Sequence, residues 1–397
     1  MMVIKNKPKV SISSRIQVLI IILLVSFASC RPGSNSVNPN EPSQVAQNNT
    51  NKDKDANLEK QSSLPYQVLW KFQGDSHSMD DIAFAQNKVF IGFQGRAFYA
   101  LDESTGDVLW EFSDGFTRSI APVANEDVVC FGSWDFHVLR SDDGEPLWSI
   151  RSNDGSSWVH SLIQKDTLYV AQGGEIRMTD RDYLHAFETF TGKEIWKFQV
   201  KGSINAPPVL AHGLIYFGTF DGWFYALEAN TGIEKWKTKL PYSISSSPAV
   251  DDTRVYVLGA KPNEGYLYAL DAFTGKEHWK FGSTQNCGFD STNKVSPLIH
   301  NGILYFAGGL LYAIDPGSGK EIWSYPANEK RWLNSFTIAN NQVYIGAHEL
   351  HVLDAKTGAL KWSFNQGMTT FVTKTLISHD KIFFRDSDGT LYALQEK

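Results

Sequence analysis

Three ionisable side chains occupy a position that recurs eight times along the chain. This position directly precedes proline in Ser247-Pro248 and Ser296-Pro297, and its eight occupants are Asp81, Ala121, His160, Pro207, Ser247, Ser296, Ser335 and Lys374. Asp, His and Lys perform acid–base chemistry, and His also binds metals. His160 has no partners at metal-ligand spacing, so we favour a solvated histidine over a metal ligand. Asp81 and Lys374 are candidates for a salt bridge or for part of a polar site.

The three cysteines exclude several kinds of site. Cys30, Cys130 and Cys287 form no Cys-x-x-Cys motif, which excludes a disulfide scaffold, a zinc ribbon and c-type haem attachment. Cys130 occupies a strand position that is Phe or Tyr in other repeats, for example Phe90 and Tyr256. We therefore interpret Cys130 as a small buried hydrophobic residue rather than a reactive thiol.

The composition indicates a folded, acidic protein. Of the 397 residues, 42% are hydrophobic and 13% are aromatic, which is too apolar for a disordered chain. The formal net charge is -6, and no run rich in Lys and Arg appears. A nucleic-acid-binding protein depends on basic patches that contact phosphates, so this class is disfavoured.

The first 29 residues predict a signal peptide. They contain four basic residues, no acidic residue and an apolar run from Val18 to Val25, which is shorter than the roughly 18 residues that span a bilayer. The run Phe27-Ala28-Ser29-Cys30 resembles a bacterial lipobox, so we predict a lipid on Cys30. Removing the four basic residues from the 37 Lys and Arg leaves 33 against 43 Asp and Glu, a net charge of -10.

Residues 30–63 predict a lipidated cysteine followed by a disordered tether. Asn, Ser, Pro, Gln and Lys dominate this segment, which has too little apolar surface to offset its conformational entropy. Arg31 follows the predicted lipidated cysteine, and this residue favours sorting to the outer membrane.

A recurring tryptophan predicts the architecture of residues 64–397. Spacings of 38 to 48 residues separate Trp70, Trp110, Trp148, Trp196, Trp236, Trp279, Trp323 and Trp362. A period near forty residues indicates a propeller or a solenoid. Each repeat contains short alternating strands joined by Gly-containing turns, which predicts a blade of four antiparallel strands. We expect each of these indoles to pack between adjacent blades.

The two ends of the repeat array complete each other. The strand at 66–72 precedes any partner, whereas the last repeat, 373–395, lacks a final Trp strand. We therefore predict an all-β, eight-bladed β-propeller of four-stranded antiparallel blades, closed by the N-terminal strand in the last blade. The aligned position before the Ser-Pro-type proline begins the innermost strand of each blade, so Asp81, His160 and Lys374 are candidate residues of the central channel.

The run Asp-x-x-Thr-Gly-Lys-x-x-Trp at 271–279 has close copies at 102–110, 315–323 and 354–362. It resembles the repeat of the pyrroloquinoline-quinone (PQQ) family of propellers, which includes quinoprotein dehydrogenases and a non-enzymatic outer-membrane barrel-assembly lipoprotein. A quinone enzyme of this family would need an acidic and amide set for calcium and, in many members, a vicinal cysteine pair. The chain lacks that pair and the long insertions of the dehydrogenases. We therefore predict no catalysis, no cofactor and no metal.

Aromatic residues outside the repeat position are candidates for a partner or ligand face. The turns of the second, third and fourth blades contribute Trp134, Trp158, Phe220 and Trp223. These turns should share one side of the propeller, where the rings could receive a protein or a sugar. Alternatively, each ring covers the core of its own blade. An insertion from Gly173 to Asp182, with Arg177 and Arg181, lies beside them.

These observations predict a lipid-anchored envelope propeller in the outer membrane. We expect it to act as a non-catalytic protein-interaction scaffold. The expected partner is an envelope protein such as a barrel-assembly complex, and we expect no nucleic acid and a chain that is monomeric by itself. Two alternatives stay open. One is a periplasmic or surface propeller that binds a saccharide, and the other is a PQQ-dependent dehydrogenase.

Overall fold

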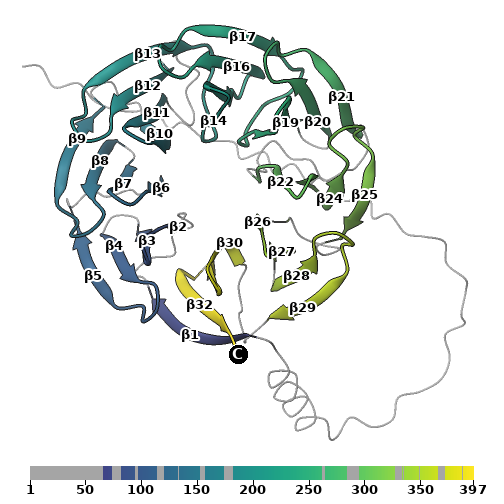
Figure 1. The fold of residues 1–397 in the computed structure, drawn as a ribbon. Coiled ribbons are helices and arrows are strands. Elements are labelled where there is room, and N and C mark those ends of the chain that lie inside the picture. Colours follow the sequence, from purple (N-terminus) through teal and green to yellow (C-terminus); the bar gives the residue numbers. More distant parts are fainter. Residues whose placement is uncertain are drawn as a thin grey trace, which may run out of the picture. The chain divides into compact units, whose positions relative to one another are not determined.

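The computed structural model describes residues 66–73, 82–93, 97–113, 120–132, 134–152, 157–173, 182–261, 264–283, 295–326, 333, 335–347, 349–364, 372–386 and 388–397. These residues form eight four-stranded antiparallel sheets arranged in a ring (Figure 1). The predicted all-β, eight-bladed propeller is therefore confirmed. No helix within the described ranges is long and apolar enough to cross a bilayer.

The first seven blades follow the chain from an inner to an outer strand. Blades 1 and 2 contain β2 (Ile82–Ala85), β3 (Lys88–Gly92), β4 (Phe98–Asp102), β5 (Val108–Phe112), β6 (Ile120–Ala124), β7 (Val128–Gly132), β8 (Asp135–Arg140) and β9 (Pro146–Arg151). Blades 3 and 4 contain β10 (Ser157–Gln164), β11 (Thr167–Gly173), β12 (Asp182–Glu188), β13 (Glu194–Val200), β14 (Val209–Ala211), β15 (Leu214–Gly218), β16 (Trp223–Glu228) and β17 (Glu234–Lys239).

Blades 5 to 7 repeat this order, and blade 8 joins the two ends of the array. Blades 5 and 6 contain β18 (Ala249–Val250), β19 (Arg254–Lys261), β20 (Glu264–Asp271), β21 (Glu277–Ser283), β22 (Leu298–His300), β23 (Ile303–Gly308), β24 (Leu310–Ile314) and β25 (Glu321–Tyr325). Blades 7 and 8 contain β26 (Ser335–Ala339), β27 (Gln342–Gly346), β28 (Leu350–Asp354), β29 (Leu360–Phe364), β30 (Val372–Ser378), β31 (Lys381–Asp386), β32 (Thr390–Glu396) and the outer strand β1 (Tyr66–Gln73).

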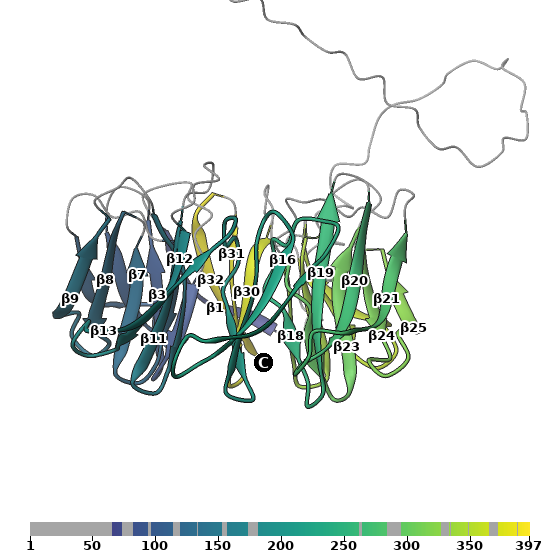
Figure 2. The ribbon, with the colours of Figure 1, turned by 90° about the horizontal axis from the view of Figure 1, so that it is seen from above.

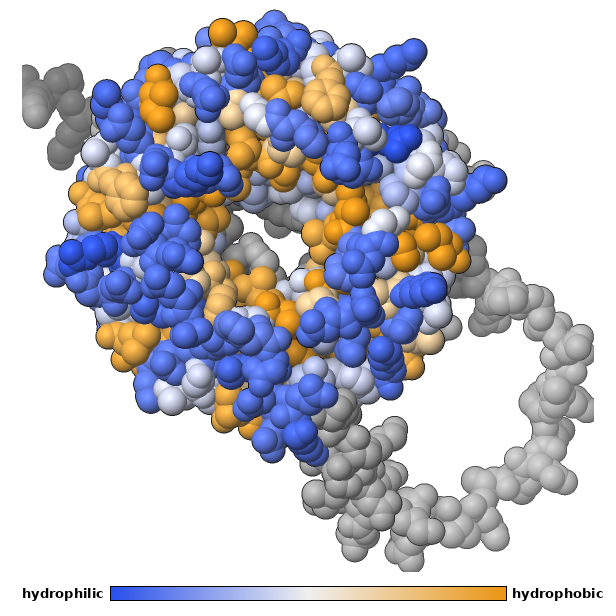
Figure 3. All heavy atoms as spheres, viewed as in Figure 1, coloured by the Kyte–Doolittle hydropathy of each residue, from blue (hydrophilic) through white to orange (hydrophobic). Residues whose placement is uncertain are grey.

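The propeller has two faces with different turns. Because the strands of a blade are antiparallel, the turns between second and third strands share one side of the ring, which we call the upper face and which is uppermost in Figure 2. The turns between first and second strands, and between third and fourth strands, lie on the opposite, lower face. Figures 1 and 3 look onto this lower face, and Figure 3 shows the central opening of the ring.

Burial depends on the position of a strand within its blade. The second strand of blade 4, β15, is buried along its whole length because neighbouring blades cover both of its faces. The outer strand β17 alternates, with Trp236 buried and Lys235, Lys237 and Lys239 exposed. Lysines on an outer strand discourage its free edge from pairing with another chain.

The hydrophobic core consists of eight clusters, one between each pair of neighbouring blades. The cluster between blades 4 and 5, for example, joins Leu214 and Phe224 to Val255 and Tyr268. The other seven clusters repeat this arrangement around the ring. Apolar burial between the sheets, rather than within one central core, therefore stabilises the fold.

Seven of the repeat tryptophans contact the next blade in the same way. Their indole N–H groups donate to backbone carbonyls at 2.8–3.1 Å, in the pairs Trp70–Glu103, Trp110–Ser141, Trp148–Thr189, Trp196–Ala229, Trp236–Ala272, Trp279–Pro316 and Trp323–Ala355. Each ring also covers the glycine of a lower-face turn in that next blade. A Cβ atom on Gly275 would lie 2.4 Å from Trp236 Cε3, so only glycine fits beneath the indole.

The ring closes at blade 8 with a different contact. Tyr66 of β1 pairs with Glu396 of β32, so no turn joins the third and fourth strands of this blade. Trp362 of blade 7 packs against the Tyr66 ring instead, with ring centroids 5.1 Å apart. Between blades 8 and 1, the buried Glu103 carboxylate lies 3.6 Å from Lys381 Nζ. Aromatic packing and an ion pair thus accompany the strand pairing at the closure.

Candidate functional site

Trp134 is an exposed residue on the upper face of blade 2. It lies in the turn between β7 and β8, and 65% of its surface is exposed. The Ser152 N–H donates to the Trp134 carbonyl at 2.9 Å. Arg151 Nε and Nη2 lie 2.7 and 2.6 Å from the two carboxylate oxygens of Asp135, and this hydrogen-bonded pair lowers the pKa of Asp135. The turn therefore displays a large ring on a held backbone, as expected of an anchor residue in a protein contact.

Phe220 lies in the corresponding turn of blade 4, whereas Trp223 is the first residue of β16 rather than part of the turn, which corrects our expectation for its position. Thr219 Oγ1 donates to Asp221 Oδ1 at 2.6 Å and accepts the Trp223 N–H at 3.0 Å. The Phe220 N–H donates to the Ser203 carbonyl at 2.8 Å. Phe220 is 37% exposed, whereas Trp223 is half-buried.

Two lysines of β17 cover the Trp223 ring. The Nζ atoms of Lys237 and Lys239 lie 5.7 and 5.1 Å from its centre, within the range of a cation–π interaction. Lys239 Nζ also lies 3.4 Å from Asp221 Oδ2. The blade 4 turn therefore combines aromatic surface with a charged pair, as the Trp134 turn does with Asp135 and Arg151.

Trp158 lies inside β10 rather than in a linking turn, which corrects our expectation for its position. It is 3% exposed, and its ring centroid lies 5.2 Å from that of His185 and 6.1 Å from that of Phe187. The strand begins at Ser157, one residue before the tryptophan. Trp158 belongs to the core between blades 2 and 3 and adds no exposed ring to the upper face.

The remaining upper-face candidates occupy different blades. Trp134 lies on blade 2, whereas Phe220 and Trp223 lie on blade 4, so blade 3 separates them (Figure 1). Arg177 and Arg181 lie outside the described residues. The structure thus shows two aromatic sites on one face, and a continuous patch across blade 3 stays a prediction.

The channel positions of blades 4, 5 and 6 contact one another around the ring. Ser247 Oγ donates to the Pro207 carbonyl at 2.8 Å, and the Ser247 N–H donates to Ser296 Oγ at 3.0 Å. Residues that are equivalent in the repeats therefore lie next to each other in neighbouring blades. Their mutual hydrogen bonds link the inner strands of these blades.

The three ionisable channel candidates are only partly described. His160 is half-buried in β10. Asp81 lies outside the described residues, and Lys374 lies in β30 at a position whose side chain is not described. The proposed Asp81–Lys374 ion pair therefore stays a prediction.

A metal site needs several side chains whose ligand atoms converge on the ion. No group of three or more His, Cys, Asp and Glu side chains within the described ranges could hold a metal ion. Cys130 is fully buried between blades 2 and 3, where desolvation raises the pKa of its thiol. Cys30 and Cys287 lie outside the described residues.

A groove on the lower face was not anticipated from the sequence. It lies between blades 4 and 5, has a volume of about 440 Å³, and is lined in part by His212, Glu228, Asn230, Lys235 and Phe273. Figure 3 shows this face as largely hydrophilic, with separate hydrophobic patches. The one sequence signal is Phe273, because most other repeats carry a polar or small residue at its place in the turn.

The repeat, the closure and the indole contacts agree with a comparison to protein families. The family model described as outer membrane protein assembly factor BamB matches residues 66–183, 134–280 and 180–397. The chain belongs to the BamB family of PQQ-like propellers. The predicted resemblance to PQQ-like repeats is thereby confirmed. Comparison with curated protein sequences gives no significant match.

Solved structures similar to this BamB-family chain include proteins with different roles. BamB from Moraxella catarrhalis is 17% identical with a TM-score of 0.66, over 84% of this chain and 98% of that one. The computationally designed protein Ika8 is 17% identical with a TM-score of 0.69, over 83% and 99% of the two chains. Quinohemoprotein alcohol dehydrogenase from Comamonas testosteroni is 14% identical with a TM-score of 0.66, over 83% and 76%. These similarities show a shared fold.

Proposed function

We propose that the chain is a non-catalytic scaffold of the bacterial envelope that binds a protein partner in outer-membrane protein assembly. The observation that carries this proposal is Trp134, a 65% exposed ring on the hydrogen-bonded upper-face turn of blade 2. A large aromatic residue on a rigid turn loses little conformational entropy on binding, which makes it an efficient anchor. Membership of the BamB family supports the assembly role.

The second upper-face site complements this anchor. Phe220 adds exposed apolar surface, and Trp223 lies beneath Lys237 and Lys239. We propose that a partner spans blade 3 and contacts both sites, with Trp134 in an apolar pocket of the partner. Arg177 and Arg181, which follow β11 in the sequence, stay candidates for the same partner.

We further propose that the protein is attached to the outer membrane by a lipid on Cys30. The lipobox-like run Phe27-Ala28-Ser29-Cys30 and the following Arg31 support this part of the proposal. The polar segment up to residue 63 would give the propeller the reach to meet a membrane-embedded partner.

Affinity purification from envelope membranes tests the proposal. We expect the wild-type lipoprotein to recover an outer-membrane barrel insertase, identified by mass spectrometry, and its own N-terminus to carry a diacylated Cys30. Trp134→Ala should reduce this recovery at least about tenfold, because truncation of an anchor residue removes about 2 kcal/mol or more of binding free energy.

A matched variant on the lower face distinguishes a specific loss of partner binding from a non-specific loss of recovery. Phe190, in a lower-face turn of blade 3, is 45% exposed, and Phe190→Ala should leave recovery unchanged. Recovery of the insertase by Trp134→Ala at the wild-type level would contradict the upper-face assignment. A wild-type protein that recovers no insertase would contradict the assembly role.

A further inference from the structure

The lower-face groove between blades 4 and 5 has the dimensions of a small-molecule site. Its volume is about 440 Å³, and pockets for small ligands span about 300–1,000 Å³. Blade 4 supplies His212 and Asn230 from its turns, Glu228 from the end of β16 and Lys235 from β17, and blade 5 supplies Phe273. The groove therefore depends on the docking of two blades, and it lies on the face opposite Trp134.

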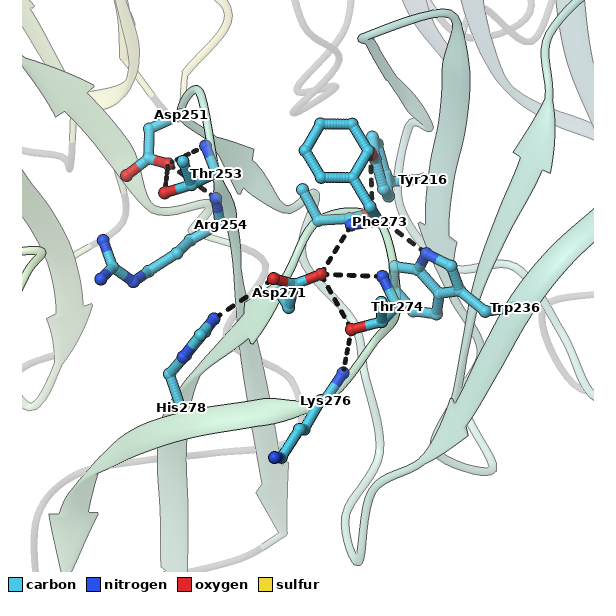
Figure 4. Close-up of polar contacts among 11 residues, drawn as sticks. Tyr216, Trp236, Asp251, Thr253, Arg254, Asp271, Phe273, Thr274, Lys276 and His278 are labelled. Carbon is cyan, nitrogen blue, oxygen red and sulfur yellow. Dashed lines mark hydrogen bonds and ion pairs between the residues drawn. The ribbon is translucent and has the colours of Figure 1, made fainter.

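Phe273 forms a rigid aromatic wall of the groove. It is 54% exposed although it is a large apolar residue. Asp271 Oδ1 accepts the N–H groups of Phe273 and Thr274 at 3.1 and 2.9 Å and the Thr274 hydroxyl at 2.8 Å. Figure 4 shows the Phe273 ring pointing away from this carboxylate. The turn thus fixes the backbone from which the ring projects before any ligand arrives.

Hydrogen bonds from blade 4 also hold the turn that carries Phe273. The Ala272 carbonyl accepts the Trp236 indole N–H at 3.0 Å and the Tyr216 hydroxyl at 3.1 Å. The Ala272 N–H donates to the Thr253 carbonyl at 2.9 Å. Figure 4 shows Tyr216 and Trp236 beside Phe273. Both blades therefore support the position of the aromatic wall.

His212 is held beside Phe273 with one nitrogen available as an acceptor. The two ring centroids lie 5.4 Å apart. His212 Nε2 lies 2.8 Å from the Asp251 carbonyl oxygen, which can only accept, so Nε2 carries the hydrogen. In the neutral ring Nδ1 is then an acceptor for a hydroxyl group.

The other polar side chains of the groove include one acidic and one basic residue, and together they offer hydrogen-bond donors and acceptors. Glu228 accepts the Thr231 hydroxyl at 2.8 Å and lies 3.5 Å from Lys235 Nζ. The Thr231 hydrogen bond and the Lys235 charge lower the pKa of Glu228, so its carboxylate is ionised at neutral pH. Asn230 is exposed and offers an amide donor and an amide acceptor.

We propose that this groove binds a neutral saccharide of one or two rings. The apolar face of a sugar ring would lie on Phe273, as aromatic rings receive apolar faces of ligands. Hydroxyl groups both donate and accept, and the groove offers acceptors on His212 and Glu228, a donor on Lys235 and both on Asn230. The paired Glu228 and Lys235 leave no net charge, which favours a neutral ligand over an ionic one.

The equivalent turn of blade 3 provides a natural control. Phe190 occupies the position of Phe273 and is also exposed, at 45%. Its neighbouring lower-face turn, in blade 2, contains Asn125, Glu126 and Asp127 rather than a histidine. An exposed phenylalanine is thus present at both turns, whereas the polar residues of the groove beside Phe273 come from blade 4.

Saturation-transfer NMR on the mature lipoprotein in lipid nanodiscs tests the proposal. The probes are methyl β-glucoside, N-acetylglucosamine and maltose, with glycerol as a polyol that has no ring. We expect transfer to at least one sugar and none to glycerol. Phe273→Ala should weaken the affinity for that sugar about tenfold, whereas Phe190→Ala should change it by less than about twofold.

A second variant is needed if circular dichroism shows that Phe273→Ala does not fold. Asn230 is exposed and makes no side-chain hydrogen bond with a described residue, so Asn230→Ala should fold and still weaken binding about fivefold. Absence of transfer to all three sugars overturns the proposal. Equal losses in Phe190→Ala and Phe273→Ala also overturn it, because they would place the sugar elsewhere. Partner recovery through Trp134 is unaffected by either outcome.

Discussion

The contact between each repeat tryptophan and the next blade can be tested at Gly275. This glycine has a φ of +71°, and a Cβ atom there would lie 2.4 Å from Trp236 Cε3 and 2.7 Å from Thr238 Oγ1. Gly302, in a lower-face turn of blade 6, has a φ of +73° and no heavy atom within 4 Å of its added Cβ. Gly275→Ala and Gly302→Ala therefore introduce the same backbone strain but differ in the contact with tryptophan.

The expected magnitudes follow from these two terms. A left-handed alanine costs about 1–2 kcal/mol, which is the whole expected effect of Gly302→Ala. Overpacking against a buried ring adds about 1–3 kcal/mol, so Gly275→Ala should lose about 2 kcal/mol more. With an m-value of about 3 kcal/mol/M, this difference separates the two urea midpoints by about 0.7 M.

Urea unfolding followed by tryptophan fluorescence measures the two midpoints. In the double variant Gly275→Ala with Trp236→Leu, the smaller side chain leaves room for the methyl group, so its loss should be less than the sum of the single losses. Equal midpoints for Gly275→Ala and Gly302→Ala would refute the reasoning, because the indole contact would then place no restriction on the turn.

Three further predictions concern other parts of the propeller. Trp134→Ala should change the free energy of unfolding by less than about 0.5 kcal/mol, whereas Trp158→Ala should lower it by about 3–5 kcal/mol, as urea titrations would measure. Desolvation lowers the pKa of His185 below its usual 6.5, so near neutral pH the unfolded chain binds a proton at this residue more readily than the folded chain does. The free energy of unfolding should therefore fall as the pH drops below about 6.5. His185→Gln should reduce this pH dependence, and an unchanged pH dependence would contradict the assignment. Burial raises the pKa of the Cys130 thiol, so iodoacetamide should label its peptide only after unfolding, and labelling of the native protein within minutes would exclude the buried position.

The fold could be predicted from the sequence because one physical contact repeats at seven of the eight boundaries between blades. The indole of Trp236 needs a glycine beneath it and a carbonyl at hydrogen-bond distance, which the turn at Ala272 and Gly275 supplies. This requirement keeps Trp and Thr-Gly in a fixed pattern along the chain. The unpaired strand at 66–72 then indicated how the ring closes, and the pairing of β1 with β32 confirms it.

The candidate site was less predictable because the direction of a side chain depends on strand limits. Trp158 follows a polar, Gly-containing segment, and one residue decides whether its ring belongs to a turn or to the core. The strand starts at Ser157, and the pairing of β10 with β11 shifts register between Trp158 and His160. The amino-acid sequence around Ser157 indicates neither where the strand starts nor where its register shifts.

The lower-face groove left even less evidence in the sequence. His212 and Phe273 come from different blades, and their proximity results from the lateral docking of two sheets. A search for sequence motifs cannot detect that two such residues, far apart in the chain, are close in the structure. The unusual Phe in the turn at 271–275 indicated only that this repeat differs from most others.

The pairing of Tyr66 with Glu396 also dictates the order in which the molecule can fold. A ribosome or export channel releases β1 before every other strand of the ring, yet the sheet partner of β1 is the last strand to emerge. Trp70 can meanwhile dock on Glu103 and Gly106 of blade 1, which holds β1 near its final place. The hydrogen-bonding edge of β1 stays open throughout, and such edges invite pairing with other chains. We expect ring closure to be the slow, final step of folding, and the interval before it to be when this protein most needs a chaperone.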